Sequence, residues 1–188
     1  MKNPPSSLRI ITIGFIAFIS LWACREATQV NTKKFDSKAT KVQMDIPQNW
    51  DFQSNVVAGD SSTQYHEQYK RTDNGGFIDI ETKFNQSDST ATARPASSAK
   101  IMAGLIQAMR VESNLYKNLT ILDESNDAVH SIAICRYVWG KKNELTYSLL
   151  AVSCEKKITK IIKVETWDQL EEAKQVSILT AVKNSLTM

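Results

Sequence analysis

The alternation of apolar and polar positions is clearest over residues 63–84, "TQYHEQYKRTDNGGFIDIETKF", and predicts a β-hairpin. Its centre, residues 73–76, supplies Asp, Asn and two glycines, which tolerate the positive φ angles of a tight turn. With these four residues as the loop, one face of the hairpin is apolar and the other is charged. The expected opposite pairs are Tyr69 with Ile80, Tyr65 with Phe84, Lys70 with Asp79, and His66 with Lys83.

Further strands are expected on both sides of this hairpin. The segment "VQMDIP" (42–47) alternates and stops at Pro47, and a second strand starts at Trp50 and runs toward Val57. Later in the chain, four apolar stretches are separated by short polar connections, which predicts an antiparallel meander. These stretches read "LTILDES", "AVHSIAICRYVWG", "LTYSLLAVSCE" and "KKITKIIKVET".

Two segments carry apolar residues at helical spacing. The first is expected over residues 96–112, just after Pro95, with a buried stripe of Ile101, Met102, Leu105, Ile106 and Met109. The second is the final helix, which is expected to start at a capping box of Asp168 and Glu171. Its expected stripe is Leu170, Ala173, Val176, Leu179, Val182 and Leu186. The fold class is therefore α+β, an antiparallel β-sheet sandwiched by amphipathic helices.

The N-terminus has the layout of a secretory signal. Lys2 and Arg9 precede the uncharged run 10–23, which is shorter than the ~20 residues of a transmembrane helix. Cys24 follows directly, and the segment resembles a bacterial lipobox, although Trp22 stands where a small residue is usual. We expect residues 1–23 to be a lipoprotein signal peptide and Cys24 to carry the lipid, including palmitate. The alternative is an ordinary signal peptide or an uncleaved anchor, with Cys24 incidental.

Composition and charge indicate the domain limits and the class of partner for the rest of the chain. Residues 24–40 lack apolar periodicity and are expected to form a flexible tether, which leaves 41–188 as a single domain. The chain has 23 Lys and Arg against 20 Asp and Glu, and residues 1–23 hold two of the basic residues and no acidic one. The net charge of the mature chain is thus close to zero, so a nucleic-acid partner is not expected.

The order of these pieces resembles the PsbP-like family. A short strand runs into "DIPQNW", a middle helix precedes a meander, and a terminal helix ends in "VKNSL". The resemblance covers roughly residues 41–187. The family includes extrinsic photosystem II subunits and DcrB-type bacterial lipoproteins. It implies a sheet sandwiched by helices and a non-catalytic binding or assembly role. No functional residue of the family matches by a sharp motif, so none is carried over.

Candidate catalytic and metal-binding motifs are few. The sequence has no HExxH, CxxC, Gly-x-Ser-x-Gly, P-loop or dinucleotide fingerprint. A zinc site needs about four ligands, or three and a water, and only two can be assembled around His66. His66 and His130 are therefore interpreted as surface histidines, and no catalytic residue, metal or cofactor is expected.

Charged side chains form two further groups. Asp79 and Glu81 project to one side beside Lys70 and Lys83, which is interpreted as a solvated charge lattice rather than an acid–base pair. A basic strand follows later, and it could face an anionic partner or lipid headgroups, or be an edge strand protected by lysines. Its lysines are Lys156, Lys157, Lys160 and Lys163.

Cysteine and tryptophan positions give two more expectations. With Gly140 opposite Leu145, Cys135 and Cys154 are offset by four residues, about 13 Å along a strand, which is too far for a disulfide. A later turn, near residues 144–145, would bring the two thiols together. Trp50 and Trp167 are expected in the core.

The sequence thus predicts an exported, lipid-anchored accessory protein of the bacterial cell envelope, with its domain in the periplasm. It would bind another envelope protein without catalysis. The alternative is a binder of a small apolar ligand, between helix 96–112 and the sheet, and an envelope hydrolase is the least favoured reading. The expected lining of that ligand site is Met102, Met109, Tyr65 and Trp50.

Overall fold

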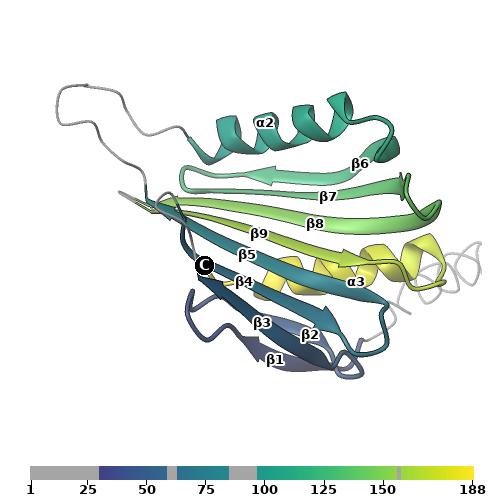
Figure 1. Ribbon diagram of the computed structural model, residues 1–188, viewed down its shortest axis with the longest axis horizontal. Helices are drawn as coiled ribbons and strands as arrows, with labels where there is room; N and C mark the ends of the chain where they lie inside the picture. Colours follow the sequence, from purple (N-terminus) through teal and green to yellow (C-terminus); the bar gives the residue numbers. More distant parts are fainter. Residues whose placement is uncertain (1–29, 59–62, 85–96, 156–157) are drawn as a thin grey trace, which may run out of the picture. The chain divides into compact units, whose positions relative to one another are not determined.

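Seven antiparallel strands form the main sheet of the computed structural model, in the order β3-β4-β5-β9-β8-β7-β6 (Figure 1). The structure describes residues 30–58, 63–84, 97–155 and 158–188. The expected signal peptide, Cys24 and residues 24–29 of the expected tether lie outside the described residues. No helix among the described residues is both long and apolar enough to cross a membrane.

Strand β9 connects two halves of the sheet, because it pairs with β5 on one side and with β8 on the other. The predicted meander is confirmed as β6 to β9, and every neighbouring pair is antiparallel. The strands are β3 (Phe52–Ala58), β4 (Thr63–Arg71), β5 (Gly76–Phe84), β6 (Tyr116–Asn126), β7 (His130–Trp139), β8 (Glu144–Glu155) and β9 (Ile158–Thr166).

A separate two-stranded sheet pairs β1 (Thr32–Asp36) with β2 (Gln43–Pro47). Phe35 is buried, and its ring centroid lies 5.9 Å from that of Phe52 and 4.8 Å from that of Tyr69. The predicted tether boundary at residue 40 was therefore wrong, since the folded unit begins at Asn31. Strand β1 could not be predicted from apolar–polar alternation, because Phe35 is the one apolar side chain in that strand.

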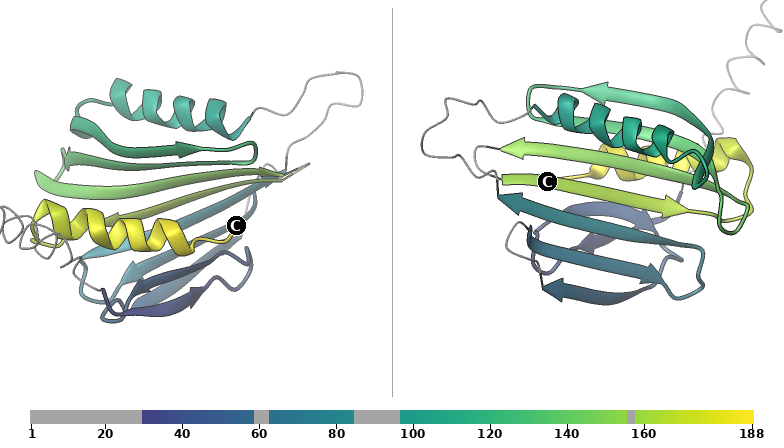
Figure 2. Two further views of the ribbon diagram at one scale, coloured as in Figure 1. Left: turned by 180° about the vertical axis from the view of Figure 1, so that it is seen from behind. Right: turned by 45° about the horizontal axis from the view of Figure 1, so that its top comes forward.

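The two described helices lie on opposite faces of the sheet (Figure 2). Helix α2 (Ser98–Val111) packs on β6, β7 and β8. It buries Met102, Ile106 and Met109 of the predicted stripe, whereas Ile101 and Leu105 are only partly buried. Helix α3 (Glu172–Ser185) packs on β2, β7 and β8. The α+β class with a mainly antiparallel sheet is confirmed. The sheet is only partly sandwiched. On its face, α2 covers β6, β7 and β8 and does not extend over the neighbouring strands β9 and β5.

The start of α3 differs from the predicted capping box. Its N-cap, Glu171, makes no side-chain capping hydrogen bond, and Leu170 is exposed. The carboxylate of Asp168 instead accepts a 2.6 Å hydrogen bond from Arg71, and its carbonyl accepts one from Gln175. Asp168 therefore stabilises a tertiary contact with Arg71 and does not cap the N-terminus of α3.

The β4–β5 hairpin turns one residue earlier than the pattern predicted. Residues 72–75 form the loop, with Asn74 at a φ of 60°, and Gly76 already belongs to β5. A Cβ atom on Gly76 would lie 2.2 Å from the backbone oxygen of Glu165, so glycine permits the close approach of β9. Each of residues 65–70 of β4 that pairs with β5 therefore meets a residue two positions earlier than predicted. A shift of two changes the cross-strand partners but leaves these side chains on the predicted face of the hairpin. The observed pairs include Tyr69 with Ile78, Lys70 with Phe77, and His66 with Glu81.

The β7–β8 hairpin also turns one residue earlier than predicted, with Trp139 opposite Glu144. Cys135 then lies opposite Ser148, six residues from Cys154, which corresponds to about 20 Å along the strand. Both cysteines are free, and Cys135 is fully buried. The separation of the thiols is thus larger than the sequence suggested, and the later-turning register does not occur.

The two tryptophans expected in the core differ in burial. Trp50 is 1 % exposed, which confirms the prediction for this residue. Trp167 is half-buried, with its ring 6.1 Å from that of Phe77 and the ammonium of Lys142 over it. The prediction for Trp167 was therefore wrong, because the strand β9 that precedes it places this ring at the edge of a surface pocket.

Candidate functional site

A groove lies beside α2, where the helix stops short of covering β9 and β5. Its volume is about 320 Å³. We call it the α2 groove, and its lining residues are Asp79, Glu81, Lys83, Leu105, Ala108, Met109, Glu112, Tyr116, Leu150, Ile161 and Lys163. The wall from α2 is mainly apolar and the wall from β5 is charged, so the groove presents two kinds of surface to one occupant.

Strand periodicity explains the charged wall. On β5, Ile78 and Ile80 are fully buried against the interior, so the side chains of Asp79 and Glu81 lie on the opposite face, which α2 leaves open. On β9, Ile162 is likewise fully buried. Ile161, opposite Glu81, and Lys163, opposite Asp79, share the open face.

Lys163 connects the α2 groove to a second pocket of about 180 Å³ near Trp167. Its ammonium forms an ion pair with Glu165 and lies 5.5 Å from the ring centroid of Tyr116. Burial lowers the pKa of Lys163, but the Glu165 carboxylate outweighs burial and the pKa is raised, so the ammonium keeps its charge. Glu165 also accepts a hydrogen bond from the buried Tyr137 hydroxyl, whose pKa is raised by burial and by that carboxylate.

Strand β9 is central in the sheet, so the edge-strand interpretation of its lysines was wrong. Lys156 and Lys157 lie outside the described residues. Sequence reasoning did not predict the ion pair of Lys163 with Glu165, although the spacing of the two residues indicates it. Lys163 and Glu165 stand two residues apart on one face of β9, which favours an ion pair in the folded protein.

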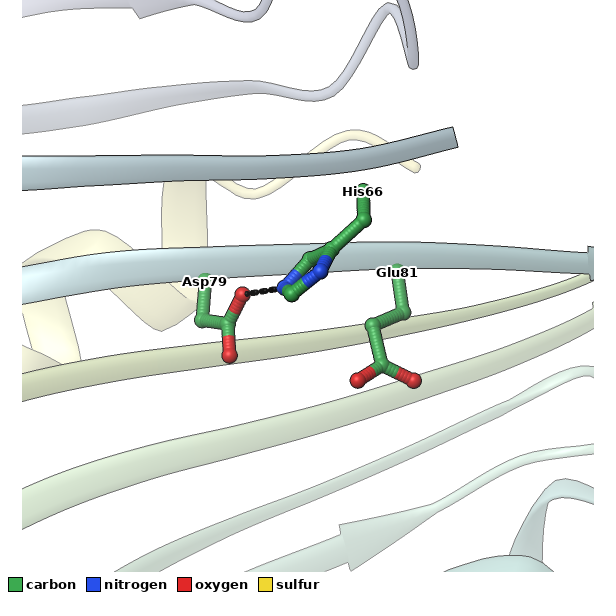
Figure 3. Close-up of side chains that lie close together, drawn as sticks. All are labelled: His66, Asp79 and Glu81. Atoms are coloured by element: carbon green, nitrogen blue, oxygen red, sulfur yellow. Dashed lines mark hydrogen bonds and ion pairs between the residues drawn. The ribbon is translucent and has the colours of Figure 1, made fainter. Parts of the chain in front are cut away.

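His66, Asp79 and Glu81 form a cluster on β4 and β5 (Figure 3). The imidazole Nε2 lies 2.5 Å from Oδ1 of Asp79, and one ligating atom from each of the three residues lies within 4.8 Å of the others. All three side chains are half-buried. The sequence had predicted at most two ligands here, and this was wrong because His66 faces Glu81 rather than Lys83.

Part of the predicted charge lattice is present beside this cluster. The ammonium of Lys83 lies 2.8 Å from a carboxylate oxygen of Glu81, while Lys70 pairs with Phe77 and not with Asp79. A histidine bonded to a carboxylate is typical of general bases and of metal ligands. The three side chains therefore offer one nitrogen and two carboxylates at the edge of the α2 groove.

His130 has a simpler environment at the turn between β6 and β7. Its Nδ1 lies 3.1 Å from the carboxylate of Asp127, which also accepts hydrogen bonds from the backbone N–H groups of Val129 and His130. These bonds, led by the His130 N–H, lower the pKa of Asp127 to about 2. The pair stabilises the turn, and among the described residues it has no third potential metal ligand close by.

The predicted lining of a ligand site between the helix and the sheet was mostly wrong. Met109 lines the α2 groove, whereas Met102 is buried beneath the helix. Trp50 and Tyr65 are both absent from the lining. Tyr65 shares the β4 face of Glu67 and Tyr69, which is opposite to the face of His66.

Comparisons with known proteins identify the fold. No protein-family model matches the sequence, and no curated protein matches it. The solution structure of cyanobacterial PsbP (CyanoP) from Synechocystis sp. PCC 6803 superposes with a TM-score of 0.54, covering 88% of this chain and 96% of that chain. The fold is PsbP-like. At 12% sequence identity, the similarity shows a shared PsbP-like fold and does not extend to functional residues.

A second similar structure is a protein of unknown function, PA94 from Pseudomonas aeruginosa, described as a putative regulator. The identity is 12%, and the match covers 73% of this chain and 84% of that chain. Its TM-score is 0.36, which is too low to indicate a shared fold. The PsbP-like assignment therefore depends on the cyanobacterial structure.

Proposed function

We propose that this chain is an exported, lipid-anchored accessory protein that acts as a non-catalytic binding or assembly module in the bacterial cell envelope. The lipid on Cys24 would hold it at the membrane, with the PsbP-like domain in the periplasm. The observation that carries the binding role is the α2 groove, an open concave surface beside a well-packed helix.

The two walls of the α2 groove define the partner's chemistry. Leu105, Ala108 and Met109 offer apolar contacts, while Asp79 and Glu81 face them across the groove. A protein segment with an apolar side chain next to a basic one would satisfy both walls. Apolar contact supplies most of the affinity at such sites, and a few polar groups fix orientation.

A small apolar ligand is the alternative occupant of the α2 groove. Its volume of about 320 Å³ lies at the lower end of ligand pockets, which span roughly 300–1,000 Å³. Leu105, Met109, Leu150 and Ile161 give it an apolar lining. Native mass spectrometry distinguishes the two, because a co-purified apolar molecule would support the ligand and its absence would support a protein partner.

A photo-crosslinking residue at position 105 should capture an envelope protein in the native membrane, and Ala108→Glu should abolish that product. Leu105 lines the α2 groove, and Ala108→Glu would put a longer, charged side chain into the apolar wall, where it would displace the partner's apolar side chain. The matched control carries the crosslinker at Leu170, an exposed leucine outside the groove. Equal products from both positions, or a product that survives Ala108→Glu, would contradict binding in the groove.

Cys24→Ala should release the folded protein from the membrane fraction or leave an unprocessed precursor. Several acyl chains are needed for stable anchoring, and each buried CH₂ contributes ~0.8 kcal/mol. Membrane fractionation with immunodetection measures the outcome, with Cys154→Ala as the control that should remain anchored. Processed Cys24→Ala protein that still sediments with the membrane would show that another part of the chain holds it there.

A further inference from the structure

We propose that His66, Asp79 and Glu81 form a binding site for a divalent transition metal, with zinc as the probe. This inference goes beyond the proposed binding role of the α2 groove, with which the site shares the side chains of Asp79 and Glu81. It depends on three side chains that the hairpin register brings together, and it names a ligand class that the sequence did not predict.

The scaffold of this cluster is two paired strands. His66 on β4 lies directly opposite Glu81 on β5, and Asp79 is two residues away on the same face. In Figure 3 the imidazole of His66 points toward Asp79, and both carboxylates extend to the same side of β5. Ligands carried by strands are positioned more accurately than ligands on loops, so little ordering is needed for binding.

The distances are close to those of an occupied site. Zinc binds nitrogen and oxygen at ~2.0–2.2 Å, so two ligand atoms of one ion are at most about 4 Å apart. The three ligating atoms lie within 4.8 Å of one another, and the contact between His66 and Asp79 is 2.5 Å. Side-chain rotations that open this contact and draw Glu81 inward, each by about 1 Å, would complete the site.

The donor set favours zinc-like ions over magnesium or calcium. An imidazole nitrogen suits zinc, copper, iron and nickel, while magnesium and calcium take oxygen ligands. Three protein ligands leave a fourth position for water. Asp79 and Glu81 line the α2 groove, so that position is accessible from the groove.

Two lysines compete with a metal at this site. Lys163 lies opposite Asp79, but its ammonium is engaged by Glu165. Lys83 pairs directly with Glu81 at 2.8 Å, so a metal must displace it. Removal of Lys83 should therefore tighten metal binding, whereas a charge lattice without a metal site predicts no such gain.

Isothermal titration with zinc measures the affinity of the full chain in detergent. Cys24→Ser is present throughout, because a free thiol at this position could bind zinc. We expect one zinc per chain, and His66→Gln and Asp79→Asn should each weaken binding by at least about tenfold, the loss that even outer-shell changes cause. Magnesium and calcium at the same concentration should not compete.

His130→Gln is the matched control, since it removes a histidine that is also paired with an aspartate. It should leave zinc affinity unchanged, and Lys83→Gln should raise it severalfold. Thermal unfolding in a chelator verifies that the variants fold. Zinc binding that is absent, that responds equally to His66→Gln and His130→Gln, or that weakens in Lys83→Gln would overturn the proposal.

Discussion

Trp50→Ala should lower the free energy of unfolding by about 3–5 kcal/mol, the usual loss for a buried tryptophan. Trp50 is 1 % exposed, and its ring lies 6.3 Å from that of Phe52. The guanidinium of Arg71, itself buried, lies 4.7 Å from the Trp50 ring centroid. Alanine would leave a cavity and remove the aromatic face under a buried charge, so packing and electrostatics weaken together.

Urea unfolding followed by far-UV circular dichroism measures this loss. Trp167→Ala is the matched control, because Trp167 is half-buried and its removal exposes little new interior. Its effect should be clearly smaller than that of Trp50→Ala. Equal losses for the two variants would show that Trp50 does not carry the packing role that its burial indicates.

Glu67→Gln should lower the free energy of unfolding by about 2–3 kcal/mol, near the upper end for an impaired buried hydrogen-bond partner. Glu67 is fully buried. Its carboxylate accepts hydrogen bonds from the backbone N–H groups of Ala39 and Thr40, from the Thr40 hydroxyl and from the Tyr69 hydroxyl. A glutamine amide would direct N–H groups toward these donors, so the connection from β1 to β2 would lose its attachment to β4.

The loss of unfolding free energy caused by Glu67→Gln should depend on pH. Burial raises the pKa of this carboxyl, but the hydrogen bonds from Ala39, Thr40 and Tyr69 outweigh burial and hold the pKa below its ordinary value of 4.5. Because the folded pKa is lowered, the stabilisation is complete above about pH 4.5 and is lost as the pH falls through the folded pKa. The difference between wild type and Glu67→Gln should therefore shrink in acid.

Chemical denaturation at neutral and acidic pH tests the Glu67 prediction. Glu171→Gln is the control, because Glu171 is exposed and makes no side-chain capping bond. Its effect should stay within about 0.5 kcal/mol at either pH. A Glu67→Gln loss that is equally large in acid would contradict the stabilising role of the ionised carboxylate.

Local patterns predicted most of the secondary structure. The meander and the stripe of α2 followed from periodicity, because each buries one face along a continuous segment. The β1 strand and the cap of α3 did not follow, since their residues are held by partners distant in sequence. Phe35 packs on Tyr69, and Asp168 binds Arg71.

Both hairpins show why the candidate site was only partly predictable. Each turns one residue earlier than the turn-forming residues suggested, and a one-residue change in the loop shifts the partners by two. His66 consequently meets Glu81 instead of Lys83. The α2 groove depends on a longer-range feature, the position of β9 beside β5, which the order of elements along the chain does not reveal.

The central position of β9 also makes the whole sheet depend on the C-terminal part of the chain. Without residues 158–166, strands β3 to β5 and strands β6 to β8 would form two separate sheets, each with a new unpaired edge. A chain released without its last thirty or so residues would have no means of joining these two sheets. The integrity of the whole sheet therefore depends on one strand close to the C-terminus, although most of the sheet's strands precede it in the chain.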